Sequence, residues 1–239
     1  MTQFLEKKYV QKDSIEKRDY QVNLAEQAIR ENCIVVLPTG LGKTAIALHV
    51  IAEYLSKGTG GVLFVAPTRV LVNQHYEFLK NNLTLDDVSL ITGEDTISKR
   101  TKLWNNSVIC ATPEITKNDF DRGIVSPDQF NLVIFDEVHR TVGDYAYSGI
   151  AQRFEDSDIR IVGMTATLPS EKQKATEILT RLKITSVAER TEDSPDVKPY
   201  TQETNTEWIN VELPPELKAI QKLLKLALDE RYDVLRKNG

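Results

Sequence analysis

The sequence predicts an α/β fold in which a doubly wound parallel sheet carries helices on both faces. Short apolar runs rich in β-branched residues alternate with longer segments of helical periodicity, which is the rhythm of such a sheet. Several runs are apolar at successive positions, as strands buried on both faces require. The chain has 239 residues, of which 41% are hydrophobic, and this is enough for one large core.

The expected strands are the apolar runs themselves, and the expected helices are the periodic segments between them. The strands are CIVVL (33–37), GVLFVA (61–66), VSLIT (88–92), SVICA (107–111), LVIF (132–135) and IRIVGM (159–164). The helices are expected at residues 20–30, 43–56, 69–81, 98–105, 145–154 and 171–182. We see no internal repeat and no low-complexity tract.

The character of the sequence changes near residue 188, and three regions are expected. Residues 1–188 form the α/β domain, 189–214 connect, and 215–239 begin a helical domain. The connecting region is polar at first, with a possible short strand at 207–212. In the last region one helix face is apolar, through Leu217, Ile220, Leu224 and Leu228. Such a face needs a partner surface, so we expect the natural protein to continue beyond residue 239.

Charge and cysteine content restrict the possible partners. The net charge is −5, so a nucleic acid would have to be held by a local basic patch. Cys33 and Cys110 each lie in an apolar run, which predicts buried free thiols and not a disulfide or zinc site. No run is apolar enough to span a membrane and the N-terminus has no signal-peptide core. We therefore expect a cytoplasmic protein, or a nuclear one in a eukaryote, with no membrane partner.

A phosphate-binding loop is predicted where the first strand meets PTGLGKT, residues 38–44. Gly40 and Gly42 allow a tight turn whose N–H groups point at phosphate oxygens, Lys43 adds a cation, and Thr44 offers a hydroxyl to Mg²⁺. The strict pattern begins with glycine, where this chain has Leu37. The alternative is a glycine-rich turn with a solvated lysine, but a strand precedes and a helix follows, as a phosphate loop requires. The cofactors are then ATP and Mg²⁺, and the ATP-binding residues are Pro38, Thr39, Gly40, Leu41, Gly42, Lys43 and Thr44.

The run LVIFDEVHR places two adjacent acids at the end of a buried strand. Parallel sheets bind ligands outside the carboxyl ends of their strands. Asp136 is therefore predicted to hold Mg²⁺ through its water shell, and Glu137 to be the general base for the attacking water. A solvated strand end is the alternative for both acids. His139 is predicted not to bind zinc, since no other histidine or cysteine lies nearby in the sequence; it either couples sites or makes a structural hydrogen bond.

Asp136-Glu137-Val138-His139 resembles the D-E-x-H box of superfamily-two helicases, and further motifs of that superfamily occur in the expected order. They are RDYQ at 18–21, APTR at 66–69, TG at 92–93, ATPE at 111–114 and TAT at 165–167. The resemblance implies a P-loop NTPase with a RecA-like sheet, in which Gln21 reads adenine and Lys43, Asp136 and Glu137 are catalytic. It further implies coupling by His139, Thr165 and Thr167, and nucleic-acid contacts by Pro67, Thr68, Arg69, Thr92, Gly93, Thr112 and Pro113.

Within that superfamily the chain resembles archaeal Hef and the Fanconi anaemia group M helicases. The similar segments are LPTGLGKT, FDEVHRTVGDYAY, SPDVKPY and EWINVELP. The resemblance implies an ATP-dependent helicase or translocase that remodels forked or branched DNA. It also implies a second RecA-like domain of the same chain, which supplies arginine fingers. These 239 residues alone are then expected to be inactive.

Other hypotheses remain open from the residues. The enzyme could be a double-stranded RNA helicase of the Dicer or RIG-I-like type, or a nucleotide-gated switch that binds nucleic acid without unwinding it. Gln21 could be a surface residue, Arg69 a solvated side chain, and Thr92 and Thr112 simple caps. Thr165 and Thr167 could satisfy local backbone groups. Lys218, Lys222 and Lys225 form a basic stripe that is either a solvated face or a DNA contact.

Overall fold

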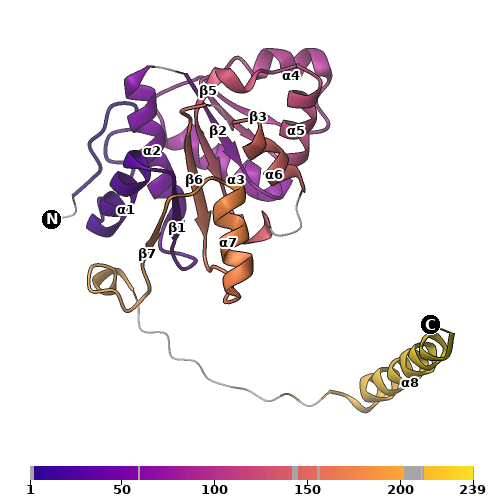
Figure 1. Ribbon diagram of the computed structural model, residues 1–239. Coiled ribbons are helices and arrows are strands. Elements are labelled where there is room, and N and C mark those ends of the chain that lie inside the picture. Colours follow the sequence, from indigo (N-terminus) through magenta and orange to yellow (C-terminus); the bar gives the residue numbers. More distant parts are fainter. Residues whose placement is uncertain are drawn as a thin grey trace. The chain divides into compact units, whose positions relative to one another are not determined.

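The computed structural model describes residues 3–58, 60–141, 145–154, 157–201, 211 and 213–238. The chain divides into two compact units, Met1–Thr201 and Gln202–Gly239 (Figure 1), and each is described by itself.

The first unit is built on one seven-stranded sheet in the order β3-β4-β2-β5-β6-β1-β7, and every strand pair is parallel. The strands are β1 Cys33–Val36, β2 Gly61–Val65, β3 Val88–Ile91, β4 Val108–Ala111, β5 Phe130–Phe135, β6 Arg160–Thr165 and β7 Ser186–Glu189. The doubly wound parallel sheet and the six expected strands are confirmed. The edge strand β7 was not expected from the sequence.

The helices of the first unit are α1 Asp19–Arg30, α2 Lys43–Lys57, α3 Arg69–Asn82, α4 Ile97–Leu103, α5 Pro113–Asp121, α6 Tyr145–Gln152 and α7 Lys172–Arg181. The six expected helices are present with small shifts at their ends, and α5 is additional. Short 3₁₀ turns lie at Pro127–Gln129, Val138–Thr141 and Lys198–Tyr200.

Helices cover both faces of the sheet (Figure 1), and a hydrophobic core lies on each face. One packs α1, α2 and α3 onto the sheet through side chains such as Leu24, Ile46 and Leu79. The other packs α5, α6 and α7 through side chains such as Phe120 and Ile150. Burial on both faces explains why the strand runs are apolar at successive positions.

The first unit continues to Thr201, past the expected boundary at residue 188. Tyr200 packs on the fully buried Tyr20, with 5.6 Å between ring centroids, and the guanidinium of Arg18 lies over the Tyr200 ring. Arg190 forms an ion pair with Asp196 at 2.8 Å. The polar segment after β7 is therefore bound to the same domain.

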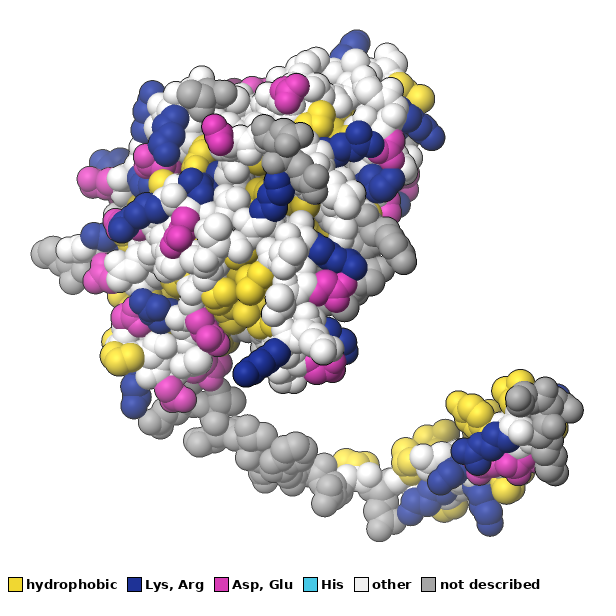
Figure 2. Space-filling model, viewed as in Figure 1, with side chains coloured by type: hydrophobic (Ala, Val, Ile, Leu, Met, Phe, Trp, Pro, Cys, Tyr) yellow, Lys and Arg dark blue, Asp and Glu magenta, His cyan; other side chains and the backbone are white. Residues whose placement is uncertain are grey.

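In the second unit, α8 Pro215–Asn238 is the amphipathic helix expected after Pro214. Figure 2 shows apolar and basic side chains side by side along it. The apolar side chains expected on one face are about half exposed: Leu217, Ile220, Leu224 and Leu228. The possible strand at 207–212 lies outside the described residues, except Val211, which is in no regular element.

No helix in the described part of the chain is both long and apolar enough to cross a membrane. Cys33 and Cys110 are buried free thiols, as expected. Burial raises the pKa of both thiols, so both are protonated near neutral pH.

Candidate nucleotide and nucleic-acid sites

The phosphate loop leaves the carboxyl end of β1 and turns into α2. Gly40 and Gly42 have φ values of 87° and 86°, the left-handed region that glycine adopts without a steric penalty. Gly42 is the N-cap residue of α2, and no side chain caps this helix start. The first N–H groups of α2 therefore keep the arrangement that binds an anion.

The side chains of the loop fit a phosphate site. Lys43 Nζ donates to the carbonyl of Leu37 at 3.0 Å, so the ammonium group is held across the loop. Thr44 is half-buried in the first turn of α2, while Thr39 and Gly40 are exposed. The backbone N–H of Leu37 donates to the carbonyl of Thr165 at 3.0 Å, which anchors the loop to β6.

Gln21 is part of the phosphate-loop structure. Its side chain is buried, and Nε2 donates to the carbonyl of Leu41 at 3.0 Å. The hydroxyl of Tyr20 donates to the same carbonyl at 2.8 Å. A Cβ added at Gly42 would overlap Gln21 Nε2. The hypothesis that Gln21 is a surface residue is wrong, because α1 and the loop pack together here.

Asp136 follows β5 and is buried, with 4% of its surface exposed. Its backbone N–H donates to the carbonyl of Val65 at 2.8 Å, and the hydroxyl of Tyr147 donates to its own carbonyl at 2.8 Å. Oδ2 lies 2.7 Å from Nε2 of His75, which comes from α3. The alternative of a solvated strand end is therefore wrong for Asp136.

His75 was not identified from the sequence. A signal was available, since His75 shares the buried face of α3 with Val72 and Leu79 at helical spacing. A histidine on such a face lacks water and needs a polar partner. The sequence does not show which residue, 61 positions away, that partner is.

Glu137, His139, Thr165 and Thr167 form a connected polar group. Glu137 has φ of 52°, an uncommon backbone conformation for a non-glycine residue, closed by a hydrogen bond from the Arg140 N–H to its carbonyl at 3.0 Å. His139 Nδ1 lies 3.2 Å from Glu137 Oε2 and 3.0 Å from Thr165 Oγ1. The Thr165 hydroxyl donates to the carbonyl of Thr167 at 2.8 Å. Nδ1 must then carry the proton that both oxygens accept.

The expected nucleic-acid residues follow β2, β3 and β4 at the same edge of the sheet. Thr68 caps α3 by accepting from the Leu71 N–H at 3.3 Å. Arg69, 57% exposed at its side chain, pairs with Glu94 at 2.7 Å. Arg69 is thus exposed as expected, but an acid partner that the sequence did not reveal holds its guanidinium.

Thr92 and Thr112 differ in what their side chains do. Asp95 Oδ2 accepts from the backbone N–H of Thr92 at 2.8 Å and from its hydroxyl at 3.0 Å. Although burial has the opposite effect, hydrogen bonds from Lys99 and Thr92 lower the pKa of Asp95. Thr112 is the N-cap residue of α5 but makes no side-chain cap bond. The hypothesis that both are simple caps is therefore wrong.

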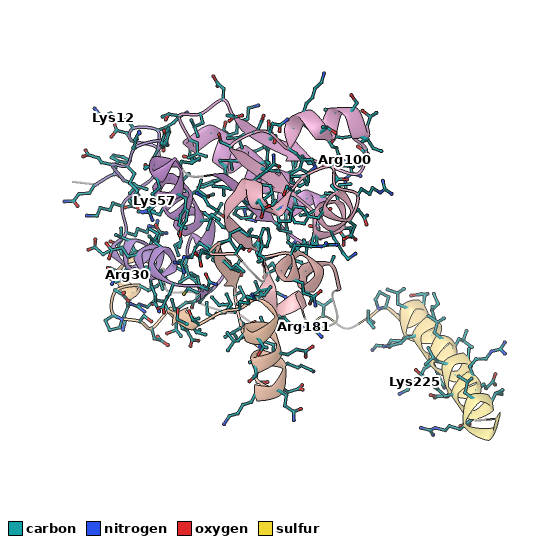
Figure 3. All side chains as sticks on the ribbon, turned by 45° about the horizontal axis from the view of Figure 1, so that its top comes forward. Lys12, Arg30, Lys57, Arg100, Arg181 and Lys225 are labelled. Atoms are coloured by element: carbon teal, nitrogen blue, oxygen red, sulfur yellow. The ribbon has the colours of Figure 1, made fainter. Side chains whose placement is uncertain are left out.

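A buried ion pair stabilises the turn between Thr92 and Asp95. Arg100 of α4, labelled in Figure 3, donates to the fully buried carboxylate of Asp119 through Nε at 2.8 Å and Nη2 at 2.9 Å. Trp104 Nε1 donates to the same carboxylate at 2.8 Å. Arg100 Nη1 also donates to the carbonyl of Asp95. The Thr92 turn is thereby tied to both α4 and α5.

Strand order separates the two sets of residues. The phosphate loop follows β1, Asp136 follows β5 and Thr165 ends β6, and these three strands are neighbours in the sheet. Arg69, Thr112 and Thr92 follow β2, β4 and β3, which are also neighbours. All strands are parallel, so all these residues lie at one edge of the sheet. We call the part around the phosphate loop and Asp136 the nucleotide half, and the part that holds the residues expected to contact nucleic acid the nucleic-acid half.

Comparison with known proteins identifies the family. A family model described as DEAD/DEAH box helicase matches residues 18–176, more than half of the chain. The chain belongs to the DEAD/DEAH box helicase family. Membership implies that this domain binds ATP, and the structure gives the RecA-like fold expected for it.

Relatives within this helicase family are named for activities on both nucleic acids. A Methanocaldococcus jannaschii protein named as an ATP-dependent RNA helicase is 41% identical over 99% of this chain and 31% of its own length. The Fanconi anemia group M protein homolog of Mus musculus is 35% identical over 86% of this chain and 10% of its own. The Saccharomyces cerevisiae ATP-dependent DNA helicase MPH1 is 32% identical over 92% and 23%. The chain thus spans less than a third of these relatives.

Among solved structures, the Hef helicase domain of Pyrococcus furiosus superposes with a TM-score of 0.79 at 38% identity. It covers 97% of this chain, and this chain covers 50% of it. The resemblance to Hef and the group M helicases is therefore confirmed.

In the described part of this helicase chain, no cluster of three or more His, Cys, Asp or Glu side chains could hold a metal ion. His139 makes its described contacts with Glu137 and Thr165.

Proposed function

We propose that this chain is the ATP-binding domain of a DNA helicase or translocase that remodels forked or branched DNA. The observation that carries the proposal is the sheet edge with its two halves: a phosphate loop beside an acid pair on one half, and helix starts that follow the neighbouring strands on the other. Similarity to Hef, MPH1 and a Fanconi anemia group M homolog supports DNA as the substrate.

The residues present fit ATP with Mg²⁺. Thr44 and Asp136 offer a hydroxyl and a carboxylate, the hard oxygen ligands that Mg²⁺ prefers. When bound, Mg²⁺ neutralises charge on the phosphate oxygens. Lys43 adds a positive charge to the loop, and Gln21, which supports the loop from α1, is the residue proposed to read the adenine base. Glu137, next to Asp136, accepts the proton of the attacking water.

The polar group around His139 joins Glu137 to Thr165 and Thr167 at the end of β6. His139 Nδ1 contacts both Glu137 and Thr165, so a movement of Glu137 is transmitted to Thr165 through the imidazole ring. Thr165 also accepts the N–H of Leu37 at its carbonyl, so it touches the start of the phosphate loop as well. This arrangement supports a role in coupling hydrolysis to movement.

On the other half of the edge, α3 begins a few residues after the end of β2, and α5 begins just after the end of β4. Helix N-termini and an exposed arginine bind phosphates without reading bases. Thr68, Arg69, Thr92, Gly93, Thr112 and Pro113, together with Pro67, are the residues proposed to contact the DNA backbone. Contact of this kind suits an enzyme that moves along DNA of any sequence.

Phosphoryl transfer also needs charge neutralisation from the opposite side of the nucleotide, where an arginine finger contributes about 10³-fold or more. We expect that arginine to come from a second RecA-like domain of the same protein. On this proposal residues 1–239 alone bind ATP but hydrolyse it negligibly and do not unwind DNA.

A second candidate is an RNA helicase, because the relative from Methanocaldococcus jannaschii carries that name. Phosphate release by the protein encoded by the whole open reading frame separates the candidates. We expect stimulation by forked DNA and little by duplex RNA, whereas the reverse order would favour the RNA helicase. A rate that no nucleic acid changes would contradict both and leave a nucleotide-gated switch.

Glu137→Gln is the matched active-site control in that assay, since the amide keeps the shape of the side chain. Loss of a general base lowers turnover by about 100-fold or more, while ATP binding is kept. Near-normal turnover of this variant would remove Glu137 as the base.

A further inference from the structure

We propose that His75 is a positioning residue that orients Asp136 toward Mg²⁺ and links it to the nucleic-acid end of α3. The proposal rests on the proposed function, in which Asp136 holds Mg²⁺ and α3 begins at a DNA contact. It adds a residue that no motif described above contains.

The contact is short and shielded from water. His75 Nε2 and Asp136 Oδ2 are 2.7 Å apart, and the two side chains are 10% and 6% exposed. An ionised carboxylate only accepts hydrogen bonds, so Nε2 carries the proton and donates it. In such a dry setting a hydrogen bond fixes direction more strongly than it does at a surface.

Both partners are held in place by the sheet. The imidazole packs against the ring of Phe64 in β2, with 4.4 Å between centroids. The backbone N–H of Asp136 donates to Val65, the next residue of the same strand. With Oδ2 held by His75, Oδ1 has no hydrogen-bond partner among the described residues. The donor thus fixes which oxygen stays available to a hydrated cation.

The same histidine sits on the element that begins the nucleic-acid half. α3 starts at Arg69 and carries His75 six residues further along, a rise of about 9 Å in a rigid helix. A shift of α3 on binding a phosphate backbone therefore reaches Asp136 through one side chain. Removing a hydrogen bond that orients a metal-binding side chain typically lowers metal affinity by about 10–100-fold.

The test measures ATP affinity of the 239-residue chain by calorimetry, once in Mg²⁺ and once in EDTA. The quantity compared is the ratio of the two affinities. His75→Phe keeps the packing on Phe64 but removes the donor, and His75→Asn keeps polarity but is too short to reach Asp136. His75→Gln places an amide nitrogen near the position of Nε2 and is the rescue variant.

We expect the affinity ratio to fall about tenfold in His75→Phe and His75→Asn, and to be largely kept in His75→Gln. Affinity in EDTA stays unchanged in all three, which a general folding defect would not allow. Should one variant fail to bind ATP in EDTA, the other decides by the same ratio. A wild-type ratio in both loss variants would overturn the proposal.

Asp136→Ala separates this proposal from the proposed function. If Asp136→Ala keeps the wild-type ratio, Asp136 does not hold the cation and the proposed function fails at that residue. If the affinity ratio falls in Asp136→Ala but stays at the wild-type value in the His75 variants, only the positioning role of His75 fails.

A second arm tests the link to α3. By thermodynamic linkage, a single-stranded DNA oligonucleotide that favours the oriented Asp136 raises the affinity for ATP in Mg²⁺. We expect this increase in the wild type and in His75→Gln, and its loss in His75→Phe. An equal increase in His75→Phe, or none in the wild type, would remove the link.

Discussion

Gly42 and Gly40 offer a matched pair for testing how the phosphate loop is held. Both have positive φ, so an alanine at either position costs about 1–2 kcal/mol in backbone conformation. At Gly40 an added Cβ meets nothing within 4 Å, whereas at Gly42 it overlaps Gln21 Nε2. Displacing that amide leaves a buried donor without its partner, at a further cost of about 1–3 kcal/mol.

Gly42→Ala should therefore lower the free energy of unfolding by about 2–5 kcal/mol, and Gly40→Ala by about 1–2 kcal/mol. Urea unfolding of both variants and the wild type measures the difference. Introducing Gln21→Ala into each background should bring the cost of Gly42→Ala close to that of Gly40→Ala, because the overlap is gone. Equal losses for the two single variants would refute the assignment of Gln21 as the support of the loop.

Three further predictions concern single side chains. Lys43→Ala should weaken ATP binding by about 10–100-fold, the worth of one charge-assisted contact, whereas Lys57→Ala at the far end of the same helix should not; calorimetric titration compares them. Glu94→Gln should raise affinity for single-stranded DNA by up to about fivefold at low salt, because it frees the exposed Arg69; Glu26→Gln is the control of equal charge change, and an equal gain in both would contradict a specific effect of the Arg69–Glu94 pair. Burial, reinforced by nearby lysines, lowers the pKa of His49 to about 4, so the unfolded chain binds a proton that the native chain does not between about pH 6.5 and pH 4. The free energy of unfolding should therefore fall as pH falls through that window, by up to about 3 kcal/mol more than in His49→Leu. Urea unfolding of both proteins at several pH values measures this, and the same pH dependence in the two would show that His49 is not the cause.

The strands that the sequence predicted were those buried on both faces. β7 was missed because only Ala188 among its residues is buried, so no continuous apolar run marks this edge strand. α5 was missed because polar residues, Thr116 and Asp119, stand on its buried face in place of an apolar stripe. Asp119 is buried because Arg100 and Trp104 saturate its carboxylate, and such pairing between distant segments leaves no periodic trace in the sequence.

In the candidate site, too, the contiguous motifs could be predicted from the sequence, whereas contacts between distant residues could not. The phosphate loop and the acid pair are contiguous, and a strand before each of them gives its place at the sheet edge. The partners of these residues come from elsewhere in the chain, as with His75 at Asp136 and Glu94 at Arg69. Tertiary packing decides such contacts, and a single sequence carries only their burial pattern.

The boundary between the two halves of the sheet edge runs between β5 and β2, which pair in parallel with one register shift between Gly61 and Val62. Asp136 makes two contacts across it, one to the backbone of Val65 and one to His75. The backbone contact is part of the sheet and cannot change without breaking it. The side-chain contact can change by a rotation of one residue. On the proposed function, a signal from bound DNA that crosses this boundary at Asp136 therefore passes through His75, and it reaches Asp136 before the phosphate loop.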